Sequence, residues 1–262
     1  MTNFATELSN SLAAAVDAAA PSIVRVGHRA TGIAWSADGV IVTASHSLPS
    51  DDGIAVDNNP ATLLGRDAST DVAVLRVSQQ LTPLSFVDDE LKVGNLVLAA
   101  GRPGRSVRAT LGIVSAIGGE WRTDDGARIE RYIEVDGSLP SGFSGGPLLD
   151  TQGRALGLNS SRLTRAGGTV PTVTLRRIVT AILEHGSTRR PFLGIGVYPV
   201  DGGLLVMSVH AASAAKGAGM MVGDVLTSYR RPHDLHAALR EGGELVLRFT
   251  RGGVAHEVRV SL

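Results

Sequence analysis

Short apolar runs separated by turn residues dominate the chain from Ser22 to Leu158. Turn residues such as Ala37–Gly39 and Asp57–Pro60 bound these runs, and no helical pattern separates one run from the next. The runs are Ile23–Val26, Gly32–Trp35, Val40–Thr43, Val72–Leu75, Leu96–Leu98, Leu111–Val114, Tyr132–Val135 and Ala155–Leu158. Strands in such a series pair with their neighbours in antiparallel sheets, so the sequence predicts a mainly β fold, built as a sandwich or as barrels.

Length and composition narrow the function classes. A chain of 262 residues suffices for one large domain or two ordinary ones. The absence of cysteine excludes disulfides, thiolate catalysis and cysteine zinc sites. Lysine plus arginine equals aspartate plus glutamate at 25 each, and aromatic residues make up only 4%. With neither a basic patch nor stacking platforms, we expect no nucleic acid partner.

Two segments carry a helical pattern in the first 188 residues. Apolar residues recur at helical spacing over residues 3–19, which predicts an amphipathic helix that packs on its own domain or forms an oligomer contact. The second helix is predicted over Leu175–His185, with Thr174 as its cap and Gly186 as its end.

The polar stretch Ser187–Pro191 is the predicted linker. We therefore predict an N-terminal helix (1–20), a first domain (21–188) and a second domain (189–262). The second domain alternates strands with two short helices, of which the second begins at Pro232, and it ends in a hairpin that turns at Arg251–Gly253.

The N-terminal segment also bears on the cellular compartment. Glu7 and Asp17 stand where a signal peptide or a membrane anchor would need apolar residues, so we expect no membrane span. As written, the sequence predicts a cytoplasmic protein. A trimmed form of an exported protein, periplasmic or otherwise extracytoplasmic, would have the same appearance.

Three segments contain residues suited to nucleophilic catalysis. Ser144 lies in the glycine-rich segment Ser141–Pro147, His46 follows the strand ending at Ala44, and Asp71 precedes the strand that starts at Val72. Each segment alone has a structural interpretation, as a turn, a core histidine or a cap. Together they provide a nucleophile, a base and a carboxylate that orients the base, in the order His, Asp, Ser.

These motifs resemble the chymotrypsin-like serine proteases, most closely the HtrA/Deg branch. Thr43–His46 is similar to Thr-x-x-His, Thr70–Leu75 to the family's aspartate motif, and Gly142–Gly146 to Gly-Asn-Ser-Gly-Gly. The resemblance implies a chymotrypsin-like double β-barrel with His46, Asp71 and Ser144 as the catalytic triad.

The resemblance also implies a substrate site. The backbone of Gly142, Phe143 and Ser144 would form the oxyanion hole, with the N–H groups of Gly142 and Ser144 as donors. Motif alignment puts Ser138 at the floor of the substrate pocket, beside Leu139 and Val173. This uncharged pocket would favour aliphatic or small side chains over lysine or arginine.

The C-terminal region resembles a small α+β PDZ domain. Its peptide-binding loop would be Phe192, Leu193, Gly194 and Ile195, and Ala218–Leu226 is similar to the family's Ala-Gly-(Leu/Met)-x-x-Gly-Asp motif. PDZ domains bind peptide or protein C-termini by adding a strand to a sheet edge.

Three departures accompany the resemblance. Phe143 stands where the family has a polar residue, and Pro171 lacks an N–H in the stretch Thr169–Val173 that should pair with substrate. The segment from Leu226 to Pro232 is shorter than in the family.

The leading hypothesis is a serine endopeptidase that cleaves unfolded or misfolded polypeptides through an acyl-enzyme. The alternative is a catalytically silent peptide-binding scaffold or chaperone with the same fold. An enzyme that acts on one dedicated partner is a third hypothesis, with the same chemistry as the first. No cofactor is expected, and no metal site, since His233 and His236 lack a third ligand. Relatives in this branch are often trimers, which makes a homo-oligomer an open expectation.

Overall fold

The computed structural model describes residues 3–88, 91–123, 126–164, 167–185, 193–210, 213–241 and 244–261. The chain divides into two compact units, Met1–Thr188 and Arg189–Leu262. Each unit has its own hydrophobic core.

The first sheet of unit 1 has seven strands in the order β5-β4-β1-β2-β3-β7-β6, and every neighbouring pair is antiparallel. The strands are β1 (Ile23–Val26), β2 (Ala30–Ala34), β3 (Val40–Ala44), β4 (Ala55–Val56), β5 (Asn59–Pro60), β6 (Thr62–Asp67) and β7 (Val72–Arg76). One face buries a cluster that includes Val24, Ile41 and Leu75. Their alternation along the strands directs one set of side chains into this cluster and the other set toward the second sheet.

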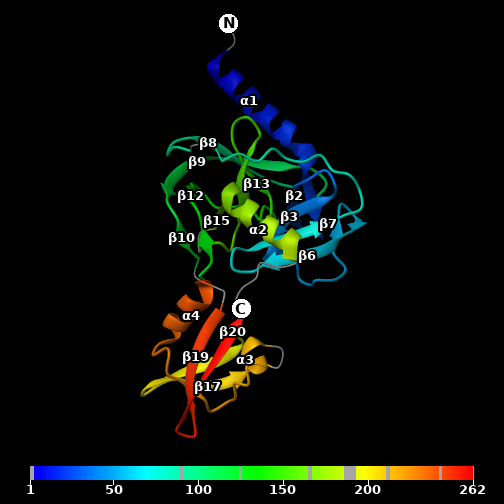
Figure 1. Cartoon of the computed structure of the whole chain (residues 1–262). Coiled ribbons are helices and arrows are strands. Elements are labelled where there is room, and N and C mark those ends of the chain that lie inside the picture. The colour runs from blue at the N-terminus through cyan, green and yellow to red at the C-terminus, as the bar shows by residue number, and fades with distance from the viewer. Residues whose placement is uncertain are drawn as a thin grey trace. The chain divides into compact units, whose positions relative to one another are not determined.

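The second sheet of unit 1 has six strands in the order β12-β9-β8-β13-β14-β15. They are β8 (Leu96–Gly101), β9 (Arg108–Gly118), β12 (Tyr132–Val135), β13 (Pro147–Leu149), β14 (Ala155–Ser160) and β15 (Gly168–Pro171). The outer strands β12 and β15 contact each other, so the sheet curls into a barrel-like form (Figure 1). A small hairpin, β10 (Trp121–Arg122) with β11 (Arg128–Ile129), extends from it.

The largest hydrophobic cluster joins the two sheets. It combines Ile33 and Val42 from the first sheet with Leu98 and Leu158 from the second. Helix α2 (Thr172–His185) closes the cluster with one apolar stripe that includes Leu175, Ile178 and Ile182.

Helix α1 (Phe4–Ala19), followed by the short helix η1 (Ala20–Ser22), contacts this core only near its C-terminal end. Asn3 caps its start through a hydrogen bond from the N–H of Ala5. Ala15 and Ala19 are buried, whereas Phe4 is 77% exposed at the end of the helix that projects away from the sheets (Figure 1).

Unit 2 is a five-stranded antiparallel sheet in the order β16-β17-β18-β19-β20, with two helices. Its elements are β16 (Ile195–Val200), β17 (Gly203–Val209), α3 (Ala214–Gly217), β18 (Val225–Leu226), α4 (Pro232–Glu241), β19 (Glu244–Arg251) and β20 (Val254–Ser261). Strand β16 forms one edge of the sheet, and α4 packs against it.

The mainly β prediction is confirmed, and all eight predicted apolar runs coincide with strands, with Trp35 one residue beyond the end of β2. The predicted C-terminal hairpin is present as β19 and β20, and α4 begins at Pro232. One boundary was wrong: α2 begins at Thr172 rather than Leu175. The strand β15 therefore ends at Pro171, and the expected substrate-pairing stretch Thr169–Val173 is split between a buried strand and a helix. None of the described helices is long and apolar enough to cross a membrane.

Candidate active site

His46 and Asp71 come from adjacent strands of the first sheet. His46 lies in the short helix η2 (Ser45–Ser47) directly after β3, and Asp71 directly precedes β7. The register pairs Ala44 with Val72, which brings these two ends together. The backbone of Asp71 has φ +58°, so its carbonyl accepts from the N–H of Ser45 (2.9 Å) while its carboxylate accepts from the N–H of His46 (2.8 Å).

The carboxylate of Asp71 orients the imidazole of His46. Nδ1 of His46 lies 2.6 Å from Oδ2 of Asp71, and the hydroxyl of Ser160 donates to the same oxygen. An ionised carboxylate only accepts hydrogen bonds, so Nδ1 carries the proton and Nε2 is left as the acceptor. This is the tautomer that a general base requires.

Ser144 lies in the loop between β12 and β13, where two glycines flank it. Gly142 and Gly145 have φ of +84° and +86°, in the left-handed region. A Cβ at Gly145 would lie 2.1 Å from the carbonyl oxygen of Thr31, so the loop approaches β2 more closely than any side chain allows. The N–H of Gly145 also donates to the carbonyl of Asn159 (2.8 Å), which docks the loop on β14.

The backbone around Ser144 contains two N–H donors without an acceptor. The N–H of Phe143 donates to the carbonyl of Pro140 (3.1 Å), and the carbonyl of Gly142 accepts from Oγ1 of Thr31 (2.7 Å). Among the described residues, none accepts a hydrogen bond from the N–H of Gly142 or of Ser144. These two groups match the expected donors, whereas the N–H of Phe143 is already committed to the turn.

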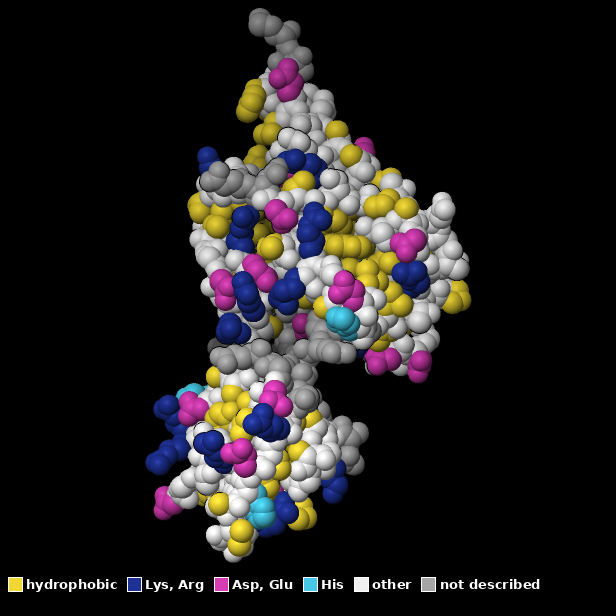
Figure 2. All heavy atoms as spheres, in the orientation of Figure 1, with side chains coloured by type: hydrophobic (Ala, Val, Ile, Leu, Met, Phe, Trp, Pro, Cys, Tyr) yellow, Lys and Arg dark blue, Asp and Glu magenta, His cyan; other side chains and the backbone are white. Residues whose placement is uncertain are grey.

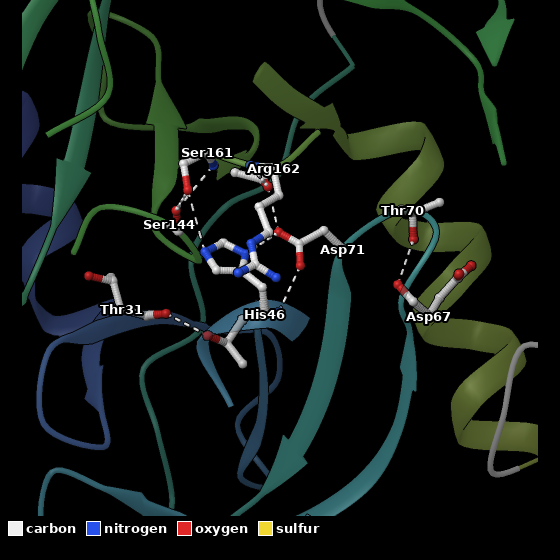
Figure 3. Close-up of polar contacts among 10 residues, drawn as sticks. Thr31, His46, Asp67, Thr70, Asp71, Ser144, Ser161 and Arg162 are labelled. Carbon is white, nitrogen blue, oxygen red and sulfur yellow. Dashed lines mark hydrogen bonds and ion pairs between the residues drawn. The ribbon is translucent and has the colours of Figure 1, made fainter. Parts of the chain in front are cut away.

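The hydroxyl of Ser144 does not bond directly to His46. Its Oγ donates to Oγ of Ser161 (3.1 Å) and accepts from the N–H of Ser161 (3.1 Å), while Oγ of Ser161 lies 3.4 Å from Nε2 of His46. Figure 3 shows Ser161 beside Ser144, with a contact to the imidazole of His46. Ser144 and His46 are thus neighbours, with the hydroxyl of Ser161 between them.

Two cavities adjoin this constellation. One, of about 740 Å³, is lined by His46, Ser144 and Gly142 together with Leu139. The other, of about 320 Å³, is lined by Ser138 and Leu139 among others. Ser138 and Leu139 thus line one cavity together, whereas Val173 is not among its lining residues: it lies in the first turn of α2 and is 40% exposed.

Two acidic residues are also among those that line the cavity containing Ser138, whereas the sequence predicts an uncharged substrate pocket there. Glu134 and Asp136 line it, because β12 runs along its wall. The hydroxyl of Tyr132 donates to Glu134, and this hydrogen bond raises the pKa of Tyr132. Asp136 accepts from the N–H of Ile113 (2.6 Å). The motif alignment did not place these two acidic residues beside Ser138.

The proposed peptide-binding loop of unit 2 is described only in part. Phe192 lies outside the described residues. Leu193 is buried and its carbonyl accepts from the N–H of Ala215 (3.0 Å), Gly194 has φ +73°, and Ile195 begins the edge strand β16.

Three side chains at the site were not predicted from the sequence: Thr31, Ser160 and Ser161. Their signal is weak, because small hydroxyl residues at strand ends are common and their partners lie far away in sequence. Thr31 lies in β2, and nothing in its local sequence indicates its bond to Gly142.

The described part of the chain contains no cluster of side chains suited to binding a metal ion. No group of three or more His, Cys, Asp or Glu side chains there could hold a metal ion. On the face shown in Figure 2, acidic and basic side chains are interspersed.

Comparison with known proteins places this geometry in a family. Residues 30–158 match the trypsin-like peptidase domain. A probable periplasmic serine endoprotease of the DegP-like type from Chlamydia pneumoniae is 34% identical over 227 residues, covering 77% of this chain and 46% of the relative. A DegP-like relative from Rhizobium meliloti is 31% identical over 267 residues, covering 88% of this chain and 52% of the relative. The chain thus spans about half the length of these curated relatives.

Solved structures give the same result over nearly the whole chain. The serine endoprotease from Yersinia pestis is 28% identical with a TM-score of 0.63, and the alignment covers 95% of this chain and 96% of that one. The HtrA-type protease AlgW, solved with a tripeptide, is 26% identical with a TM-score of 0.60 and the same coverage. The chain carries a trypsin-like peptidase domain and is homologous to the HtrA/DegP serine endoproteases.

Proposed function

We propose that this protein is a serine endopeptidase that hydrolyses peptide bonds of unfolded or misfolded polypeptides, with His46, Asp71 and Ser144 as its catalytic triad. One observation supports this most strongly. The imidazole of His46 is held by Asp71 on one side and presents Nε2 on the side of Ser144, near two backbone N–H groups for which the described residues provide no acceptor.

The proposed reaction gives each of these groups a role. Ser144 turns to His46, its Oγ attacks the substrate carbonyl, and Nε2 takes the hydroxyl proton. The oxyanion that forms accepts hydrogen bonds from the N–H groups of Gly142 and Ser144, a contribution of about 100-fold or more per donor. His46 then gives the proton to the leaving amine, and water hydrolyses the acyl-enzyme by the same steps in reverse order.

A fluorophosphonate probe tests this assignment. We expect one adduct on the parent protein, detected by intact-mass spectrometry and mapped to Ser144, and none on Ser144→Ala. His46→Ala should react at least 100-fold more slowly, because the hydroxyl loses its base. Ser78→Ala, a change at an exposed serine outside the site, is the matched control and should react like the parent. Absence of an adduct with and without an unfolded client would favour the silent scaffold instead.

The substrate class needs a separate experiment. We expect cleavage of a reduced, unfolded protein and not of the same protein in its folded form, with all cleavage abolished in Ser144→Ala. Cleavage mapping on a peptide library would separate this general activity from action on a single dedicated partner, which would give one narrow sequence pattern.

Unit 2 is proposed to be a PDZ-like domain of residues 189–262. In the sequence it follows the N-terminal helix of residues 1–20 and a peptidase domain of residues 21–188. The edge strand β16, preceded by Leu193 and Gly194 and accompanied by α4, supports this proposal because a peptide can add to a free strand edge. Fluorescence anisotropy with peptides ending in a free carboxylate should show binding, and the amidated peptide should bind at least 10-fold more weakly. Equal binding of both would contradict recognition of the C-terminus.

Compartment and assembly complete the proposal. The cytoplasmic expectation finds no support in the relatives, several of which are named periplasmic, and we propose an extracytoplasmic site of action. A trimer is proposed as the assembly, with the exposed Phe4 end of α1 as a candidate contact. Light scattering coupled to size exclusion, on the parent and on Phe4→Ser, measures the mass directly.

A further inference from the structure

Ser161 both accepts a hydrogen bond from the hydroxyl of the proposed nucleophile and donates one to it. It follows β14 directly, and its backbone N–H and its Oγ each lie 3.1 Å from Oγ of Ser144. Among the described residues, no hydrogen bond joins Ser144 directly to His46. The hydroxyl proton of Ser144 is therefore directed at Ser161 and not at the base.

The second partner of Ser161 is the base itself. Nε2 of His46 is the acceptor of the ring, because Nδ1 faces Asp71. Oγ of Ser161 lies 3.4 Å from Nε2, so it can donate there while it accepts from Ser144. One hydroxyl thus stands between the nucleophile and the acceptor that must receive its proton (Figure 3).

We propose that the Ser161 hydroxyl is a resting-state latch, which holds Ser144 in a rotamer turned away from His46. Ser161 is exposed and lies in the loop after β14, so its side chain can rotate without disturbing the core. Rotation of Ser161 away from Nε2 leaves the imidazole as the available acceptor for Ser144. Ser161 is then a positioning residue for the proposed reaction, and this inference rests on the proposed peptidase function.

The latch predicts that the enzyme becomes faster when the hydroxyl is removed. Ser161→Ala keeps the backbone N–H and the loop but deletes the competing acceptor. We expect its second-order rate constant with a fluorophosphonate to rise about fivefold. This is the change in the population of the competent rotamer when one neutral hydrogen bond that opposes it is removed. Ser161→Thr restores a hydroxyl at the same carbon and should return the rate to within twofold of the parent, a rescue that a merely structural role does not predict.

Controls and contrary outcomes are distinct. Thermal unfolding midpoints of the parent and both Ser161 variants should agree, which shows that the fold is unchanged. An unchanged or slower rate of fluorophosphonate labelling in Ser161→Ala would overturn the latch. A slower rate would indicate that the Ser161 hydroxyl relays the proton from Ser144 to His46. In either case, labelling of Ser144 itself would leave the peptidase proposal intact. Absence of labelling in all three proteins would overturn the proposed function together with the latch.

Discussion

In the proposed reaction, the backbone torsion of Gly142 determines whether its N–H and that of Ser144 can face one oxyanion. Its φ of +84° is readily adopted only by glycine, and a Cβ there would lie 2.5 Å from the carbonyl oxygen of Arg29. The carbonyl of Gly142 is in turn held by Oγ1 of Thr31 at 2.7 Å. The conformation is thus required both by torsion and by close approach.

We therefore expect Gly142→Ala to lower kcat for peptide hydrolysis about 100-fold, the loss typical of one oxyanion donor. The matched control is Gly94→Ala, since Gly94 has φ +94° but open space around its Cβ position. Both changes strain the backbone by about 1 kcal/mol, but only the first displaces the loop at Ser144. Equal activity of the two variants in a peptide-hydrolysis assay would contradict this role of Gly142.

A residue at the candidate site could be predicted from the sequence only where a short motif around it identifies it. His46, Asp71 and Ser144 each sit in a motif that can be recognised within a few residues. Ser160 and Thr31 act on partners 89 and 111 positions away. Such contacts arise from strand pairing and loop docking, which no local pattern encodes. The same reason explains why Val173 was wrongly expected beside Ser138. Its position in α2 depends on where β15 ends, which no local pattern indicates.

At the scale of elements, the loop that carries Ser144 is anchored to β8 by an apolar contact. Phe143 is only 3% exposed and packs in a cluster with Val97, Ala99 and Leu148. A Cβ at Gly101 would lie 3.0 Å from the ring of Phe143, so the strand has a gap that receives the ring. The residue that departs from the family pattern therefore has a complementary partner in this chain.

We expect the family-like change Phe143→Asn to be harmful here. It buries an amide in an apolar cluster, which costs about 3 kcal/mol, and it should release the loop and lower activity. Phe143→Leu keeps the site apolar and should cost about 1 kcal/mol. Urea denaturation and peptide hydrolysis of both variants measure this. An Asn variant as stable and active as the Leu variant would show that the anchor is unimportant.

Strands could be predicted from the sequence where a continuous run of apolar, β-branched residues marks them. The β-branched runs in β3 and β7 are examples, because both faces of these strands are buried. Short strands such as β13, which spans Pro147–Leu149, were missed because three residues carry no periodicity. The start of α2 was misplaced for a related reason: Thr172 and Val173 favour strands by propensity, yet packing against β14 continues the helix through them.

At the scale of the whole molecule, each unit depends on its own core, and unit 2 contains a buried ion pair. The side chain of Asp224 is 1% exposed and pairs with Arg251 at 2.7 Å, and it also accepts from the N–H of Met221 (2.9 Å). The hydrogen bond from Arg251 lowers the pKa of Asp224 below its ordinary value of 3.8. The pair joins the loop before β18 to the end of β19, and so holds the sheet of unit 2 together.

A carboxyl group whose pKa is lowered by folding stabilises the folded state fully at pH values above its unfolded pKa. That contribution is lost as the pH falls through the lower folded pKa. We therefore expect unit 2 to lose stability below the ordinary aspartate value of 3.8. Asp224→Asn should cost about 2 kcal/mol near neutral pH, less than breaking a fully buried pair because the side chain of Arg251 is 34% exposed. It should also flatten the dependence on acid.

Denaturant titrations from acid to neutral pH, followed by NMR of the Val206 and Gly223 amides, report on this unit, since both amides bond across β17 and the loop before β18. The matched control is Asp234→Asn on α4, whose ion pair with Arg231 is exposed and contributes below about 1 kcal/mol. If both variants lost the same stability with the same pH dependence, the buried pair would not be the cause of the acid sensitivity of unit 2. A difference confined to Asp224→Asn at neutral pH, and vanishing in acid, would assign the pH dependence to this pair.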